Sequence, residues 1–228
     1  MIVAAIDASR ETLASAIVEI GQHTSRVLAS RVDPGPRSAA AEYEVRVLHA
    51  LRELGDEVGL EVRSIEGYAL GLGACRSSLL GQTLTALKGL ALANGRPLVG
   101  ISELQVLAHV AGAGLPAGTL LVPVVDAGDG RLHVGVYERQ ADGRTRARQA
   151  DALLTLAELK EGAGAHAGAL AFGSGFDLHR TELSACLEPL ACKLRSPMGQ
   201  DVADVAAASL ASSRFDSRAI LALASRGL

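Results

Sequence analysis

The chain has 228 residues, of which 49% are hydrophobic and 3% aromatic, and its formal net charge is -3. This length allows one large domain or two small lobes, and the scarcity of aromatic residues means that Leu, Val, Ile and Ala must build the core. The small negative charge argues against strong nucleic-acid binding by this chain alone, because nucleic-acid-binding proteins usually gather a basic excess on one face.

The cysteines and the first residues indicate the compartment. Cys75, Cys186 and Cys192 form no C-x-x-C pair, which is typical of a reducing compartment and of cysteines that serve as small buried residues. The apolar residues 2–6 are interrupted by Asp7 and follow no basic segment, so they do not resemble a signal peptide. No apolar run has membrane-spanning length. We expect a cytoplasmic protein.

The first half of the chain begins as a three-stranded meander and then alternates helices with strands. Two prolines and a glycine at residues 33–36 end the meander, because proline cannot donate to a strand ladder. Apolar runs predict the strands, and apolar residues at helical spacing predict the helices. Strands are predicted at residues 2–6, 12–20, 26–32, 68–71 and 98–101, and helices at about 38–54, 79–93 and 103–110.

The second half opens with an apolar strand that ends at Asp126 and continues through a glycine-rich turn into an alternating strand. Thr155 and Glu158 have the spacing of a capping box, which predicts a helix start. A later strand ends in the turn Gly173-Ser174-Gly175. The predicted strands are residues 120–125, 132–137 and 169–172, and the predicted helices include 178–187 and 202–210.

The two halves share one opening, a short apolar strand that ends in an aspartate and leads into a polar turn and a second strand. The aspartates are Asp7 and Asp126. This repeat predicts a duplicated α/β fold. We expect an N-terminal lobe over residues 1–104 and a C-terminal lobe over residues 105–228, with a cleft between them.

Several motifs resemble the TsaB (YeaZ) family. Residues 4–9, AAIDAS, resemble the family's AIDTS start, and residues 88–104 are similar to its KGLA…PLVGVSSL stretch. Residues 124–137 resemble its VIDARRGEVYAAVY hairpin, and Gly173-Ser174-Gly175 falls where the family has a glycine-rich turn. These blocks occur in family order across nearly the whole chain.

The resemblance implies an actin/Hsp70-like (ribonuclease H-like) fold and a non-catalytic role in making tRNA threonylcarbamoyladenosine (t6A). In that family TsaB pairs with the transferase TsaD, and the ATPase TsaE joins them. The expected partners are therefore TsaD-like and TsaE-like proteins, with tRNA reached through the complex and a homodimer when the chain is alone. No cofactor is expected for this chain itself, and ATP only in the complex.

Two positions depart from the family pattern. The family's GPGSFTGLRIG loop corresponds to residues 73–83, where most of its glycines and its Phe-Thr pair are missing. A family histidine in the first helix is also missing, and Tyr43 is the residue nearest to its place.

The two strand-end turns are the candidate phosphate sites, because actin-like kinases hold phosphates against main-chain N–H groups in such turns. Asp7 and Ser9 belong to the first turn, which has no glycine and adds the negative charge of Glu11. Asp126 and Gly128 belong to the second, which is also an ordinary hairpin turn. These four residues are the candidate cofactor-binding set, as degenerate phosphate turns, and the alternative is that each turn is purely structural.

No catalytic or metal-binding residue is predicted. None of the six histidines forms an H-x-x-x-H or H-E-x-x-H pair, which disfavours a metallopeptidase. No G-x-S-x-G motif is present. Cys75 beside Arg76 could form a thiolate, but it can also be an inert residue. The competing enzyme hypothesis is a small actin-fold phosphotransferase or ATPase that acts in the interlobe cleft.

The first two long helices are predicted to carry the docking surface. Their apolar residues spread beyond one stripe, so the excess must be buried against something other than the sheet. The resemblance implies a four-helix contact with TsaD or with a second copy; the alternative is that the excess packs inside the lobe. The candidate partner-binding residues are Tyr43, Val47, Leu51, Leu54, Leu80, Leu84 and Leu87.

Overall fold

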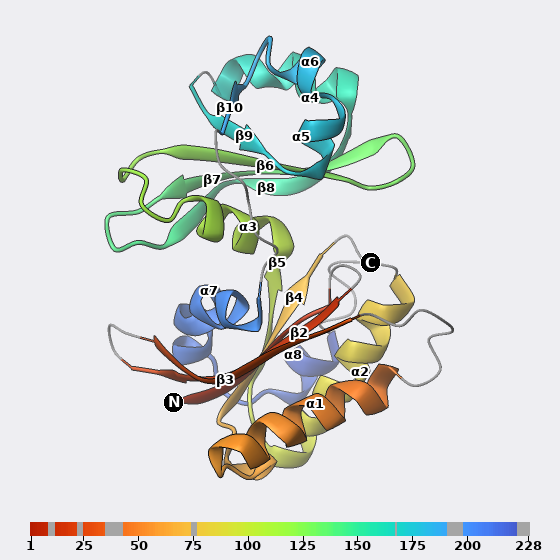
Figure 1. Cartoon of the computed structure of the whole chain (residues 1–228), viewed down its shortest axis with the longest axis vertical. Coiled ribbons are helices and arrows are strands. Elements are labelled where there is room, and N and C mark those ends of the chain that lie inside the picture. The colour runs from red at the N-terminus through yellow and green to blue at the C-terminus, as the bar shows by residue number, and fades with distance from the viewer. Residues whose placement is uncertain are drawn as a thin grey trace. The chain divides into compact units, whose positions relative to one another are not determined.

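The computed structural model describes residues 1–8, 12–21, 25–34, 43–73, 77–166, 168–190 and 198–222 (Figure 1). The chain folds into two compact units. Unit 1 comprises Met1–Ser102 together with Pro197–Leu228, and unit 2 comprises Glu103–Ser196. The predicted boundary near residue 104 is close, but the assignment of the last segment to the second lobe is wrong, because its helix packs on the sheet of unit 1.

Unit 1 is built on a five-stranded sheet with the order β3-β2-β1-β4-β5. The first three strands form an antiparallel meander, and β4 and β5 run parallel to β1. The strands are β1 (Ile2–Asp7), β2 (Thr12–Ile20), β3 (Ser25–Pro34), β4 (Gly67–Leu72) and β5 (Leu98–Ser102).

Helices cover both faces of this sheet. Figure 1 shows α1 and α2 side by side on one face and α7 on the other. Apolar alternation in the strands explains the layers: Ala4 and Ile6 join the core cluster under α1 and α2. On the opposite face, α7 approaches so closely that a Cβ on Gly199 would lie 2.7 Å from the Ala16 nitrogen. The helices are α1 (Tyr43–Val58), the short 3-10 helix η2 (Val62–Ser64), α2 (Ser77–Asn94), α7 (Gly199–Ser212) and α8 (Ser217–Ala222).

Unit 2 repeats the same sheet. Its order is β10-β9-β6-β7-β8, with β6, β7 and β8 antiparallel and with β9 and β10 parallel to β6. Counted from the edge strand β8, the sheet of unit 2 has the same strand order and the same strand directions as the sheet of unit 1 counted from β3. The predicted duplicated actin/ribonuclease H-like fold is therefore confirmed. The strands are β6 (Leu120–Asp126), β7 (Arg131–Arg139), β8 (Thr145–Thr155), β9 (Leu170–Phe172) and β10 (Glu188–Pro189).

The sheet of unit 2 also separates two apolar layers. Leu121 and Val125 face α3, whereas Val122 and Val134 belong to the cluster under α4 and α5. The predicted capping box is present: the side chain of Thr155 accepts from the Glu158 nitrogen and starts α4. In place of the predicted helix 178–187 the structure has one short helix, Arg180–Leu183, and Leu178 ends the helix before it, Ser174–Leu178. The helices are α3 (Glu103–Ala111), α4 (Leu156–Gly162), the 3-10 helix η3 (Ala163–His166), α5 (Ser174–Leu178) and α6 (Arg180–Leu183).

None of the helices in the described part of the chain combines the length and the apolar character needed to cross a membrane.

Candidate functional site

Asp7 ends β1, as predicted, and pairs in register with Ala14 and Gly71. Its side chain lies on the face of the sheet that α7 covers, because a Cβ on Gly71 would meet both the Asp7 carboxyl at 3.2 Å and Val202 of α7 at 3.5 Å. Only 5% of Asp7 is exposed. The carboxyl group is therefore buried on the side of this sheet that α7 covers. Ser9, the other candidate in this turn, lies outside the described residues.

The second candidate turn, residues 126–130, joins β6 to β7 and is held together by its own carboxylates. Asp126 Oδ1 accepts from the Gly128 nitrogen at 2.9 Å. Asp129 accepts from the backbone nitrogen of Arg131 at 3.2 Å and from its Nε at 2.9 Å. The side-chain bond from Arg131 lowers the pKa of Asp129. Both Gly128 and Gly130 have positive φ, so the glycines serve the turn geometry itself.

The glycine-rich turn after β9 packs its main chain against the end of β6. Gly173 has a φ of 110°, and a Cβ there would lie 2.4 Å from the Val124 carbonyl oxygen. The Asp126 nitrogen donates to Ser174 Oγ at 3.2 Å, and a Cβ on Gly175 would lie 3.0 Å from that same nitrogen. These glycines are required for close approach between the ends of two parallel strands.

The predicted docking helices do lie side by side, since α1 packs against α2 as well as against β2 and β3. The structure buries six of the predicted partner-binding side chains in the apolar core of unit 1. These are Val47, Leu51, Leu54, Leu80, Leu84 and Leu87, each at most 4% exposed. The side chain of Tyr43, where α1 begins, lies outside the description. The lobe itself therefore covers these six side chains. A docking face on α1 and α2 must consist of other residues.

The outward face of α1 carries two apolar side chains. Val45 is 58% exposed and Leu48 is 41% exposed. They are three positions apart and therefore neighbours on one helix face. The exposed Arg52 follows one turn later. This face is a small apolar patch with a basic residue at one end.

The outward face of α2 is a stripe of small residues at four-residue spacing, namely Gly81, Thr85, Gly89 and Ala93. A Cβ on Gly81 or Gly89 would meet nothing within 4 Å. Thr85 turns its hydroxyl back to donate to the Gly81 carbonyl at 2.8 Å. The stripe therefore leaves space in which a second helix could approach closely. The i, i+4 spacing of these small residues is visible in the sequence, but the predicted partner-binding residues of this helix were its leucines.

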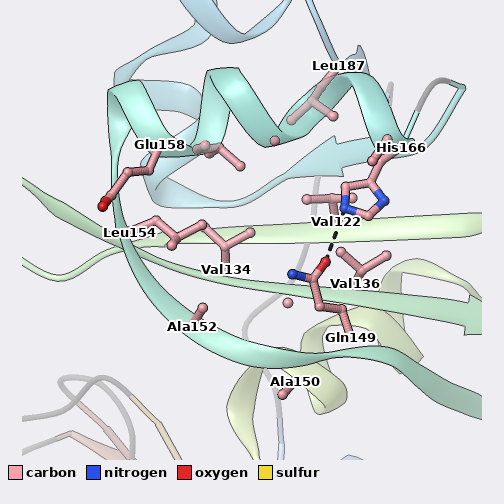
Figure 2. Close-up of a pocket in the computed structure, with 14 residues that line it drawn as sticks. Val122, Val134, Val136, Gln149, Ala150, Ala152, Leu154, Glu158, His166 and Leu187 are labelled. Carbon is pink, nitrogen blue, oxygen red and sulfur yellow. Dashed lines mark hydrogen bonds between the residues drawn. The ribbon is translucent and has the colours of Figure 1, made fainter.

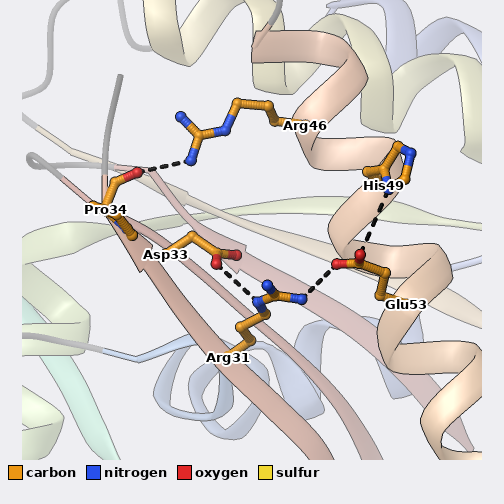
Figure 3. Close-up of polar contacts among 6 residues, drawn as sticks. All are labelled: Arg31, Asp33, Pro34, Arg46, His49 and Glu53. Atoms are coloured by element: carbon orange, nitrogen blue, oxygen red, sulfur yellow. Dashed lines mark hydrogen bonds and ion pairs between the residues drawn. The ribbon is translucent and has the colours of Figure 1, made fainter. Parts of the chain in front are cut away.

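Polar contacts hold α1 on the edge strand β3, as Figure 3 shows. Arg31 Nε bonds Asp33 Oδ1 at 2.8 Å, and the same guanidinium bonds the Glu53 carboxylate of α1. Arg46 donates to the Pro34 carbonyl oxygen at 2.8 Å. The bonds to Glu53 and from Arg46 join α1 to β3 of the same unit. This side of α1 therefore already contacts its own sheet.

No group of three or more His, Cys, Asp and Glu side chains suited to a metal ion occurs among the described residues. Cys75 and Arg76, the candidate thiolate pair, lie outside them. Cys186 is partly buried, and its thiol contacts the Leu183 carbonyl oxygen at 3.3 Å.

This chain is similar in sequence to one known protein family and similar in structure to proteins whose structures are solved. The sequence profile of the TsaD family, tRNA N6-adenosine threonylcarbamoyltransferase, matches residues 23–222. A Pseudomonas aeruginosa protein described as similar to peptidase YeaZ aligns with a TM-score of 0.74 and 23% identity, covering 95% of each chain. YeaZ from the same organism aligns with a TM-score of 0.74 and 21% identity, covering 96% of this chain and 97% of its own. No curated protein sequence matches the chain.

At these identities the structural matches establish the fold, and the profile match, which spans most of the chain, establishes the family. The chain belongs to the TsaD family and has the YeaZ fold.

Proposed function

We propose that the chain is a non-catalytic subunit of the complex that makes t6A in tRNA, and that it pairs with a TsaD-like transferase and a TsaE-like ATPase in the cytoplasm. The observation that carries the proposal is the combination of a TsaD-family sequence with a YeaZ fold over 95% of both chains. In this proposal tRNA is reached through the complex.

The state of the two strand-end turns supports a non-catalytic role. A phosphate site needs main-chain N–H groups that are free to donate and little negative charge nearby. In the second turn, the Gly128 and Arg131 nitrogens already donate to Asp126 and Asp129. Asp7 is enclosed under α7. Both observations argue against phosphate binding at Asp7, Asp126 and Gly128, and nucleotide contact at these residues and at Ser9 stays a prediction.

The outward faces of α1 and α2 supply the docking surface in this proposal. Val45 and Leu48 offer apolar area on α1, and the stripe Gly81–Ala93 on α2 lets a partner helix approach closely. A TsaD helix pair that docks here would complete a four-helix contact. When the chain is alone, the same faces would pair two copies. The buried leucines then act indirectly, by holding α1 and α2 in place.

Co-purification with a charged variant tests the proposal. The tagged chain, expressed in its native cell, should retain the TsaD homologue. Leu48→Glu should lose this partner while remaining folded, because the charge is buried only upon docking. Leu178→Glu is the matched control, since Leu178 is 62% exposed and belongs to unit 2; it should retain TsaD. Retention of TsaD by folded Leu48→Glu protein would contradict docking through α1.

Nucleotide binding separates this proposal from a small phosphotransferase or ATPase. A ligand at 100 times its Kd stabilises the folded state by about 2.7 kcal/mol. The isolated chain should show no such rise in melting temperature with Mg-ATP. A rise that Asp7→Asn and Asp126→Asn abolish would favour the enzyme.

A further inference from the structure

A cavity of about 240 Å³ lies within unit 2, between the β6–β7–β8 part of the sheet and the layer formed by α4 and η3 (Figure 2). Aliphatic side chains form most of its wall: Val122, Val134, Val136, Leu154, Leu159 and Leu187. Five of these six, all but Leu154, are buried members of the unit's apolar core. The fold therefore fixes the inner wall of the cavity, whereas its outer side, which includes the exposed Gln149, Ala150 and Glu158, is open to solvent.

The size of the cavity suits a small molecule. An engineered apolar cavity of about 150 Å³ binds benzene, and ordinary ligand pockets begin near 300 Å³. A cavity between these limits accepts a ligand of roughly ten non-hydrogen atoms at most. The aliphatic walls favour a hydrocarbon body.

A bulge in β8 turns one polar side chain into this cavity. Val134 and Val136 of β7 point to the same side of the sheet, and their partners on β8 are Ala152 and Gln149. These partners are three positions apart, and in a regular strand they would face opposite sides. The extra residue between them brings Gln149 to the cavity side, which is a recurrent use of β-bulges beside binding sites.

Gln149 and His166 form the polar end of the cavity. His166 Nε2 lies 3.1 Å from Gln149 Oε1, and Figure 2 shows the Gln149 amide nitrogen turned away from His166, toward Val134 and Ala152. With the His166 proton on Nε2, the amide nitrogen keeps its donors for a ligand. Glu158 is the acidic residue on the wall, and its Oε2 already accepts from Thr155 N and Oγ1.

We propose that this cavity binds a small, uncharged, branched aliphatic carbonyl compound, such as an amide. Its hydrocarbon body packs against the valines and leucines, and its carbonyl oxygen accepts a hydrogen bond from Gln149 Nε2. An anion is disfavoured, because among the described residues neither Lys nor Arg lines the wall to offset its loss of hydration, and Glu158 adds negative charge there. The site is independent of the docking faces in unit 1.

The probe is 3-methylbutanamide, titrated into the full-length, isotope-labelled chain and followed by amide-resolved NMR. Saturable shifts should appear at residues of β7, β8 and α4 around the cavity. The charged analogue 3-methylbutanoate, of nearly the same shape, should bind at least about tenfold more weakly. No saturable shift, or equal binding of both probes, would overturn the proposal.

Cavity-filling variants locate the site. Ala152→Leu places a larger side chain on the wall and should weaken the amide at least about tenfold. Ala150→Leu, at an exposed position on the same wall, repeats the test without altering the core. Ala147→Leu is the matched control, since Ala147 is exposed on the same strand and does not line the cavity. Unchanged binding in folded Ala150→Leu protein, or loss only in Ala147→Leu protein, would overturn the proposal.

Discussion

Replacing Gly81 and Gly89, the helical glycines of α2 that have open space beside them, should stabilise the protein. Gly89 lies in a regular helix, and a Cβ there would meet nothing within 4 Å. Alanine is favoured over glycine inside a helix by about 0.5–1 kcal/mol, because glycine loses more backbone freedom upon folding. Gly81 is equally open and lies roughly 12 Å away along the helix axis. The two effects should add, so the double variant should gain about 1–2 kcal/mol.

Urea unfolding followed by circular dichroism measures this gain. The midpoint should rise while the slope with denaturant stays constant, because the surface exposed on unfolding is unchanged. The melting temperature should rise by roughly 2–4 °C per kcal/mol. The measurement uses protein dilute enough to be monomeric, because a second copy docked on α2 would cover these glycines. An unchanged or lowered midpoint of the monomer would refute the view that this face of α2 is open in the free chain.

A larger side chain at the same position should separate folding from docking. Gly89→Leu introduces a good helix former but fills the space that a partner helix would need. The variant should stay folded and lose the TsaD homologue in a pull-down. Gly164→Leu is the matched control, because Gly164 is an equally open, exposed glycine in unit 2. Partner binding by folded Gly89→Leu protein at wild-type strength would remove α2 from the interface.

Three further changes test the fold. Leu51→Glu should unfold unit 1, detected as loss of amide-exchange protection in α1 and α2, because Leu51 is 0% exposed and the charge would be buried without a partner. Gly173→Ala should cost roughly 2 kcal/mol or more in urea unfolding, since its φ is left-handed and the added Cβ would strike the Val124 carbonyl. Thr155→Ala should lower the melting temperature by removing the helix cap. The backbone N–H of Thr155, and then its hydroxyl, donate to Glu158 and lower the pKa of that carboxyl group. The ionised carboxylate therefore stabilises the folded protein above the usual glutamate pKa, and this contribution is lost as the pH falls. The difference in melting temperature between Thr155→Ala and wild type should accordingly shrink below about pH 4.

The strands with continuous apolar character were predictable, and β8, the polar edge strand of unit 2, was not. Residues 2–6 and 120–125 read directly as β1 and β6 because both are buried, β-branched-rich runs that end at an aspartate. β8 is mostly exposed and mixes arginine, glutamine and alanine, so it lacks the alternation that identifies a half-buried strand. Its pairing with β7 decides its conformation.

The site was only partly predictable for a related reason. The sequence indicated that α1 and α2 lie together, because both have more apolar residues than one sheet face needs. It could not indicate which residues face outward, since Leu51 and Leu84 are covered by the packing of α1, α2 and the sheet. The role of Gln149 in the cavity depends on a bulge, which moves a side chain to the other face with no clear local signal.

Reconstituted t6A synthesis tests whether this chain is a non-catalytic subunit of the t6A complex. The TsaD and TsaE homologues from the same cell, unmodified tRNA, ATP and the other substrates are combined with and without this chain, and t6A is measured by mass spectrometry of the nucleosides. We predict no t6A from this chain alone, t6A formation when it joins its partners, and loss of that effect with Gly89→Leu but not with Asp126→Asn. Equal t6A yield with and without the chain, or steady ATP turnover by the isolated chain that Asp126→Asn abolishes, would contradict the account.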